Sequence, residues 1–297
     1  MSDVHKKNVE LFELGDKVKR LADDLLENFN AKQIKLKDIP PHKRNCIFFF
    51  TRALKTYGAI TALAQEGYGQ DISPLLRSLL ENLISVKYVL NHLPSADDKA
   101  KRLVEYKWVI FKRYISNEKD NVTSEMDPFR KELMSNKSLI EKKVEEFKKE
   151  FKITSDKALI TWSGRSMRDM AKMISQTLLE EYDSTFRLSS RFSHPSIMGD
   201  RQYLDYEDNY IVFSALPSSV GVDSNYVIAM IYLAEFIDIF NTLFGLKTES
   251  QIKALKAELK ETSETKIYSP KSAKKPSAES SGRKVLEFKI KFQTPPK

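Results

Sequence analysis

Two arginines and a histidine in the stretch T-F-R-L-S-S-R-F-S-H-P-S have types and spacing that suit a chemical site. Arg187, Arg191 and His194 stand at i, i+4 and i+7. On a helix this spacing places all three within about 60° of arc on one face. Pro195 disfavours helical geometry at His194, so we expect the helix to end there, where the negative dipole end favours a protonated imidazole. Histidine can act as a general acid or base and arginine can stabilise charge on a phosphate, so the pattern indicates an anion site.

The same residues also fit a purely structural role. In that interpretation His194 caps the C-terminus of its helix, while Arg187 and Arg191 pair with nearby Asp or Glu side chains. The residue types alone leave both interpretations open.

A second polar feature lies on the stretch Ser73–Leu93, S-P-L-L-R-S-L-L-E-N-L-I-S-V-K-Y-V-L-N-H-L. Ser73 can cap a helix and Pro74 suits its first position. Apolar residues cover well over half of the circumference, so we expect this helix at the centre of the protein. One narrow polar stripe remains, formed by Arg77, Glu81, Ser85 and Tyr88. Arg77 and Glu81 are four residues apart and can pair, as a structural network or as part of a site.

Short motifs in these stretches resemble an uncharacterised helical family of bacteria, known only as a domain of unknown function. They are P-L-L-R-S-L-L-E-N at 74–82, an aromatic residue near Tyr88, Trp162, and Y-x4-R-L-S-S-R-F-S-H-P-S at 182–196. The resemblance covers roughly residues 40–245. It implies a helical fold and no established activity.

The spacing Arg187-x6-His194 also resembles, more distantly, the Arg-x4–6-His pattern of HEPN proteins (higher eukaryotes and prokaryotes nucleotide-binding). These are compact helical bundles, and many are metal-independent endoribonucleases in toxin and antiphage systems. The resemblance implies that His194 and Arg187 flank the scissile phosphate, usually across a homodimer interface, without a cofactor. Arg191 would contact the phosphate, and Arg77 with Glu81 would orient the site. The chain departs from the family pattern at Leu188, where a polar residue is common.

A different function class fits the same polar centre. A non-catalytic helical sensor or adaptor would use it to bind a nucleotide, a small anion or a protein partner. If Arg187 and His194 are open to solvent and face a cleft or a dimer mate, the nuclease is favoured. If both side chains are buried and fully hydrogen-bonded, with Glu81 or a loop Asp as the partner, the structural network is favoured.

Composition limits the remaining classes. The chain has four His and one Cys, Cys46, so we expect no Cys/His metal site and no internal disulfide, as suits the reducing cytoplasm. We also expect no membrane span, because the most apolar stretch, Tyr226–Ala234, is closed by Glu235 and Asp238. Of the net charge of +8, residues 264–297 carry +6, from nine Lys/Arg and three Asp/Glu, so the body is nearly neutral.

Hydrophobic periodicity predicts an all-α protein, a single bundle of seven or eight helices over residues 1–262. The expected helices are 4–29, 42–66, 73–93, 96–117, 127–151, 166–193, 223–245 and 248–262, with 127–151 charged and projecting, and 195–221 a long loop. Residues 263–297 are rich in Ser, Pro and Lys and predict a disordered basic tail. Within it, 285–292 alternates with strand period, which suggests pairing with a sheet edge, in one interpretation that of a protein partner.

Overall fold

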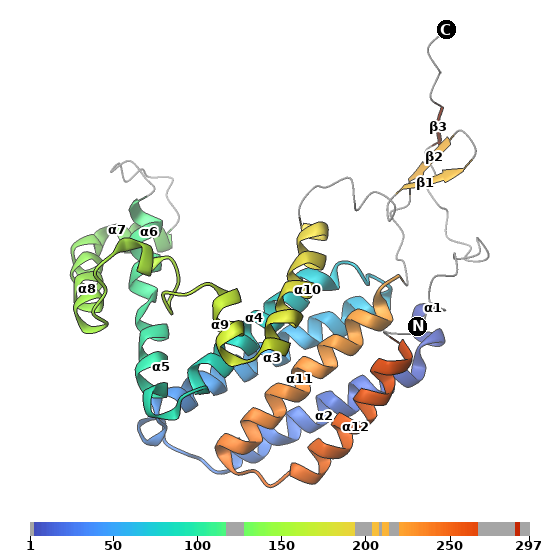
Figure 1. Cartoon of the computed structure of the whole chain (residues 1–297), viewed down its shortest axis with the longest axis horizontal. Helices are drawn as coiled ribbons and strands as arrows, with labels where there is room; N and C mark the ends of the chain where they lie inside the picture. Colours follow the sequence, from blue (N-terminus) through green and yellow to red (C-terminus); the bar gives the residue numbers. More distant parts are fainter. Residues whose placement is uncertain are drawn as a thin grey trace. The chain divides into compact units, whose positions relative to one another are not determined.

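The computed structural model is an all-α protein with three short strands (Figure 1). It describes residues 3–116, 128–193, 204–207, 210–213, 220–266 and 289–291. The α-helices of this part are α1 Asp3–Lys7, α2 Val9–Ala31, α3 Pro41–Glu66, α4 Ile72–Leu90, α5 Ala96–Glu105, α6 Lys107–Ser116, α7 Pro128–Ser135, α8 Lys137–Glu150, α9 Met167–Ile174, α10 Gln176–Ser193, α11 Val222–Phe244 and α12 Glu249–Lys266. Short 3₁₀ turns occupy Leu36–Asp38, Leu93–Ser95 and Asp156–Leu159. The all-α prediction is confirmed.

The described part of the chain has twelve α-helices where seven or eight were predicted, because four expected helices are each interrupted once. The interruptions fall at Asn8, Tyr106, Asn136 and Ser175. Asn8 and Asn136 have bent backbones, and Ser175 is extended with φ −164° and ψ 157°. Asn and Ser side chains compete with the backbone for hydrogen bonds, which favours helix ends. Apolar residues continue at helical spacing on both sides of each break, so hydrophobic periodicity alone predicted one continuous helix where the structure has two.

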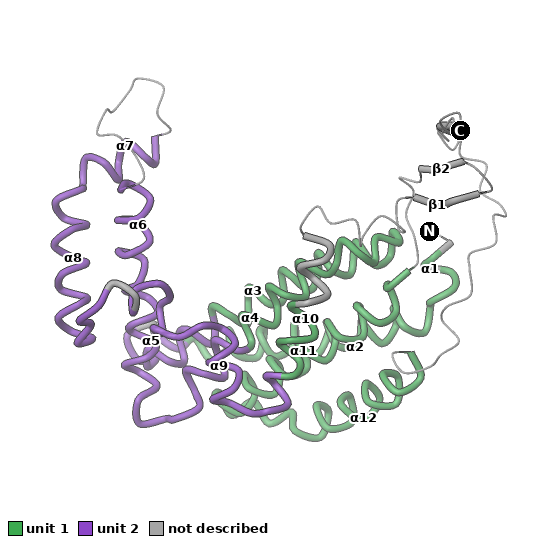
Figure 2. The backbone as a smooth tube through the Cα atoms, turned by 45° about the horizontal axis from the view of Figure 1, so that its top comes forward, with its two compact units in different colours: residues 1–33, 48–83, 180–297 green, residues 34–47, 84–179 purple. Residues whose placement is uncertain are grey.

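The chain divides into two compact units (Figure 2). Unit 1 comprises residues 1–33, 48–83 and 180–297, and unit 2 comprises residues 34–47 and 84–179. The long helices α3 and α4 each contribute residues to both units. The assignment of residues 1–262 to one domain, with a tail from 263, stays a prediction.

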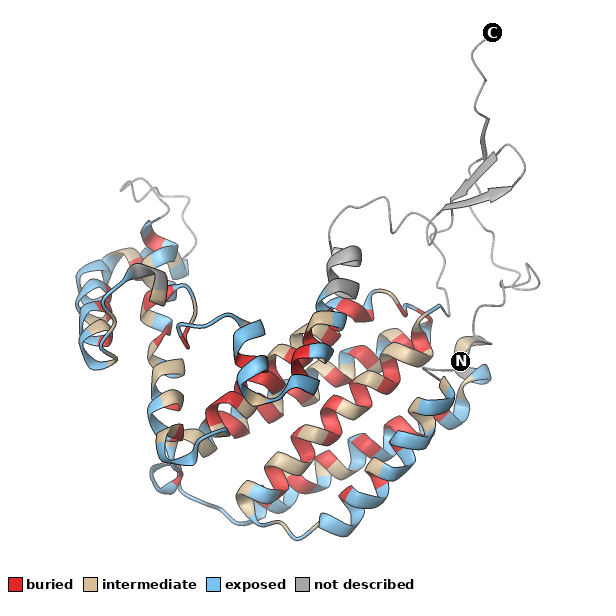
Figure 3. Ribbon diagram, in the orientation of Figure 1, coloured by how far each residue is buried: buried red, intermediate tan, exposed pale blue. Residues whose placement is uncertain are grey.

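The core of unit 1 is built around α11, which packs against α2 and α12. Most of α11 is buried or half-buried (Figure 3). The ring of Phe240 stacks on Phe50 at 4.3 Å between centroids and meets Phe29 edge-on at 5.5 Å. Among the described helices α11 alone is long and apolar enough to cross a membrane, by length and composition, and 56% of its apolar window is buried inside the structure.

A close approach of three helices marks one end of this core. The hydroxyl of Tyr57 on α3 lies 3.0 Å from the carbonyl oxygen of Gly15 on α2 and 3.1 Å from the hydroxyl of Tyr226 on α11. Thr61 lies 3.3 Å from that Tyr226 hydroxyl. A Cβ added at Gly15 would lie 2.6 Å from Tyr226 Cζ, so only glycine lets the two helices meet here.

Unit 2 contains the charged region expected to project. Helix α8 packs against α6, and three residues of the predicted stripe, Ile140, Val144 and Phe147, are buried. Leu139, which was also assigned to the stripe, is 46% exposed, so that residue was placed wrongly. The Tyr106 hydroxyl between α5 and α6 lies 2.6 Å from the carbonyl oxygen of Leu159 and 2.8 Å from that of Ile160.

Three strands form a small antiparallel sheet in the order β1–β2–β3. β1 Leu204–Glu207 pairs with β2 Tyr210–Phe213, with Leu204 opposite Phe213. The predicted loop over 195–221 is therefore wrong for residues 204–207 and 210–213. The first strand, L-D-Y-E, alternates apolar and polar residues, and the second, Y-I-V-F, consists of the aromatic and β-branched residues that favour strands. β3 Lys289–Lys291, which lies within the segment 285–292, pairs with β2 of the same chain, with Ile290 opposite Ile211.

Candidate functional site

The arginines of the predicted chemical site lie on the part of α10 that belongs to unit 1, which begins at Glu180. Helix α10 is described to Ser193, and the helix end predicted at His194 from Pro195 lies outside the described residues. Arg187 and Arg191 occupy successive turns of its last half, on one side of the helix axis by their spacing. His194 lies outside the described residues.

The predicted ion pair on α4 is confirmed. Arg77 Nε donates a hydrogen bond of 2.9 Å to Glu81 Oε1. The two side chains are 33% and 29% exposed, so the pair is partly desolvated and still in contact with water. Such an i,i+4 pair on a half-buried face stabilises a helix modestly and fixes the direction of the guanidinium.

The same arginine joins α4 to α10. Its guanidinium carbon lies 4.2 Å from the centroid of the Phe186 ring, a cation–π contact. Phe186 is 36% exposed and directly precedes Arg187 in α10. The contact therefore brings the polar stripe of α4 to the turn of α10 that carries the predicted catalytic arginine.

Two further contacts hold α10 in place at this level. Thr185 Oγ1 lies 3.2 Å from the hydroxyl of Tyr232 on α11, a hydrogen bond between buried groups. Burial raises the pKa of Tyr232 to about 12, so the hydroxyl stays neutral. The rings of Tyr182 and Phe186, one helical turn apart, lie 5.6 Å from each other. Helix α10 is thus fixed against α11 through Thr185 and against α4 through Phe186.

These contacts define what the arrangement can do. Arg77 contacts Glu81 on α4 and Phe186 on α10, so it links the two helices. Of Arg187 and Arg191 the structure gives the position on α10 alone. In the described part of the chain no group of three His, Cys, Asp or Glu residues could hold a metal ion.

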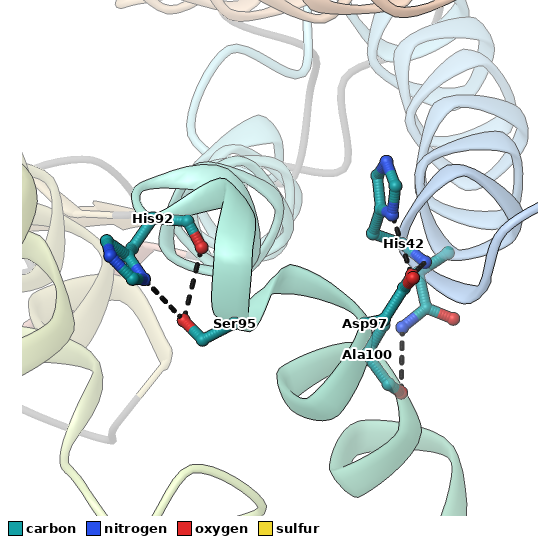
Figure 4. Close-up of polar contacts among 6 residues, drawn as sticks. His42, His92, Ser95, Asp97 and Ala100 are labelled. Carbon is teal, nitrogen blue, oxygen red and sulfur yellow. Dashed lines mark hydrogen bonds and ion pairs between the residues drawn. The ribbon is translucent and has the colours of Figure 1, made fainter.

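A second polar cluster, in unit 2, was missed by the sequence patterns. It begins where α5 is joined to the start of α3 (Figure 4). Asp97 Oδ1 accepts a hydrogen bond of 3.0 Å from the backbone N–H of His42 and lies 2.7 Å from His42 Nδ1. These hydrogen bonds hold the pKa of the Asp97 carboxyl below its ordinary value. Asn45 Nδ2 also donates to the carbonyl oxygen of Ala100 at 3.0 Å.

The cluster continues along α5 with two cations on one face. Lys99 Nζ lies 4.9 Å from the centroid of the Tyr88 ring and donates a hydrogen bond of 3.0 Å to the Tyr88 carbonyl oxygen. Arg102 follows one turn later, with its guanidinium 5.9 Å from the Phe151 ring. The only signal in the sequence is the i, i+3 spacing of Lys99 and Arg102, which an ordinary solvated helix face also shows.

A polar hollow in unit 1 offers less chemistry. It is lined by residues of α2 and of the turn into α12, namely Asp24, Glu27, Asn28, Lys247, Thr248, Ser250 and Gln251. The hollow is open to solvent, and its two carboxylates face a single lysine.

Comparison with known proteins identifies a family of unknown function and indicates no activity. A family model described as "Family of unknown function (DUF5677)" matches residues 44–211, more than half of the chain. The match includes α4, α5 and α10, which carry most of the residues named in the two polar clusters, though not His42 and Asn45 of α3 or Phe151. Neither the comparison with curated proteins nor that with solved structures finds a match.

Proposed function

The chain belongs to the DUF5677 family of unknown function, and we propose that it is a metal-independent endoribonuclease of the HEPN-like type. The observation that carries the proposal is the contact of Arg77 with Phe186, which fixes the start of the Arg187–Arg191–His194 segment against the centre of unit 1. A catalytic constellation needs such support, because small misplacements of reacting groups slow a reaction steeply.

In the proposed reaction the 2′-hydroxyl of the RNA attacks the adjacent phosphorus. His194 accepts the proton of that hydroxyl as a general base or donates a proton to the departing 5′-oxygen as a general acid. Arg187 and Arg191 stabilise the charge that develops on the phosphate oxygens. The P–O5′ bond breaks, which leaves a 2′,3′-cyclic phosphate and a 5′-hydroxyl. Arg77 and Glu81 are positioning residues in this scheme.

The test is RNA cleavage by the purified full-length chain in the presence of EDTA. We expect cleavage to 2′,3′-cyclic phosphate ends, reduced at least about a hundredfold in His194→Ala and Arg187→Ala, as removal of a general acid–base or of a charge-stabilising group commonly gives. His92→Ala and Arg20→Ala are matched controls, because both remove an exposed side chain of the same type at another position. Growth after inducible expression, with total-RNA analysis, gives the cellular counterpart.

A specific observation favours a second candidate, a non-catalytic sensor that binds a phosphate-bearing ligand through α10. Arg77 is engaged by Glu81, as a structural network would have it. A sensor would bind RNA or a nucleotide with an affinity that falls with salt and with Arg187→Ala or Arg191→Ala, but would leave RNA intact. If neither cleavage nor binding responds to these arginines, both proposals fail.

A further inference from the structure

Among the residues that the structure describes, the cationic pair of α5 in unit 2 has no anionic partner. Lys99 and Arg102 make no ion pair with any Asp or Glu of the part of the chain that the structure describes. The side chain of Arg102 forms no hydrogen bond with the described residues either, and its Nε is buried without an acceptor. An arginine withdrawn from water with unused donors is unfavourable unless another group supplies the acceptor.

Packing holds the guanidinium of Arg102 where it is. Gly164 has φ +72°, and a Cβ added there would lie 3.0 Å from Arg102 Nη2. The Phe151 ring lies at 5.9 Å from the guanidinium carbon. The two terminal nitrogens of Arg102, Nη1 and Nη2, have no acceptor among the described residues. Unlike Nε they are not fully buried, so they can donate hydrogen bonds to an oxygen of a ligand.

Tyr88 contacts the first of the two cations. Its ring centroid lies 4.9 Å from Lys99 Nζ, and Arg102 follows Lys99 one turn later on α5. Trp162 packs edge-on against it, with 5.8 Å between ring centroids, so the tyrosine is fixed. The Tyr88 hydroxyl has no hydrogen-bond partner among described residues and can add a third donor. Burial lowers the pKa of both Lys99 and Arg102, and no carboxylate counteracts that effect at either group.

We propose that Lys99, Arg102 and the Tyr88 hydroxyl form a binding site for a phosphate group of a small ligand. Two full positive charges match the dianion of a phosphate monoester better than the single charge of a carboxylate. The contacts of His42 with Asp97 and of Asn45 with Ala100 fix α5 against α3, so the site is supported from behind (Figure 4). The site lies in unit 2 and uses none of the residues proposed for RNA cleavage.

Titration of the purified full-length chain with inorganic phosphate tests the site, with calorimetry in a phosphate-free buffer at constant ionic strength. We expect saturable binding that weakens about tenfold in Lys99→Met and in Arg102→Lys, because each loses a charged or bidentate donor. Lys101→Met is the matched control and should bind as the wild type does, because Lys101 is exposed and pairs with Glu150. Acetate at the same ionic strength should not displace phosphate.

Three results of this titration would each overturn the proposed phosphate site. If the wild type shows no saturable binding, if Lys101→Met weakens binding as much as the other two variants, or if acetate competes equally, the proposal is overturned. Circular dichroism melts establish that each variant is folded. Should Arg102→Lys fail to fold, the comparison of Lys99→Met with Lys101→Met decides alone, because Lys99 is partly exposed on the same helix. RNA cleavage is measured separately and does not enter this result.

Discussion

At the residue scale, the close packing of α2 against α11 in unit 1 depends on the absence of a side chain at Gly15. We expect Gly15→Ala to destabilise the protein by about 1–3 kcal/mol, the usual cost of an extra group in a tightly packed core. The new methyl would meet the buried ring of Tyr226, which its hydrogen bonds to Tyr57 and Thr61 hold in place. Urea unfolding measures the change.

Gly58→Ala is the control for this prediction. Gly58 lies inside α3 and has no neighbour within 4 Å of an added Cβ. Alanine there should be neutral or stabilise by about 0.5–1 kcal/mol, since it reduces the entropy lost by the helix backbone. If both variants changed stability equally, the role assigned to the Gly15 contact would be refuted.

Residue types predicted one contact of the α4 site and missed the other. The i,i+4 spacing of Arg77 and Glu81 was sufficient to predict their hydrogen bond, because neighbours on one helix are set by local geometry. The contact of Arg77 with Phe186 joins residues 109 positions apart, and no local rule carries that information. The pair Lys99 and Arg102 was missed for the same reason, since the absence of a carboxylate partner is a property of the folded neighbourhood.

At the scale of the element, the start of α9 depends on its N-cap. Ser166 Oγ accepts a hydrogen bond of 3.0 Å from the backbone N–H of Asp169 and donates one of 2.7 Å to Asp169 Oδ2. We expect Ser166→Ala to cost about 1 kcal/mol, as the loss of a serine cap commonly does. Ser184→Ala, which removes an exposed hydroxyl inside α10, should cost less. Thermal unfolding compares the two, and equal losses would contradict the assignment.

The cap also gives this prediction a pH dependence. The hydrogen bond from Ser166 lowers the pKa of the Asp169 carboxyl below its ordinary value. Its contribution to stability is therefore present above the ordinary pKa of an aspartate and is lost as the pH falls through the lower, folded value. The difference between wild type and Asp169→Asn should shrink in acid, below that ordinary pKa.

Helix ends show where sequence reasoning reaches and where it stops. The cap at Ser166 and the stop at Gly245, in the left-handed region with φ 58°, follow from residue type and were predicted. The break at Tyr106 was not, because the bonds of its hydroxyl to Leu159 and Ile160 come from a distant segment. Tertiary contacts of this kind override a continuous apolar pattern.

At the scale of the whole molecule, the two compact units should differ in how they respond to local damage. Phe147 is buried in unit 2, with its ring 6.3 Å from Tyr106 and 4.9 Å from Phe151. We expect Phe147→Ala to remove about 3–5 kcal/mol from the packing of α6 and α8. The rate of amide hydrogen exchange should then rise in these two helices and stay unchanged in α11 and α12 of unit 1. Local openings that need less free energy than global unfolding are confined to one cooperative unit.

Phe240→Ala provides the reciprocal measurement. Its ring stacks on Phe50 and contacts Phe29, so the loss falls on α2, α3 and α11. Because α3 and α4 continue from one unit into the other, exchange in these two helices reports how far an opening spreads. Faster exchange restricted to the unit that carries each substitution would establish two cooperative units joined by shared helices. An equal rise in both units from either substitution would show instead that the shared helices make the chain one cooperative structure, so that occupation of the phosphate site in unit 2 would also stabilise the α10 site in unit 1.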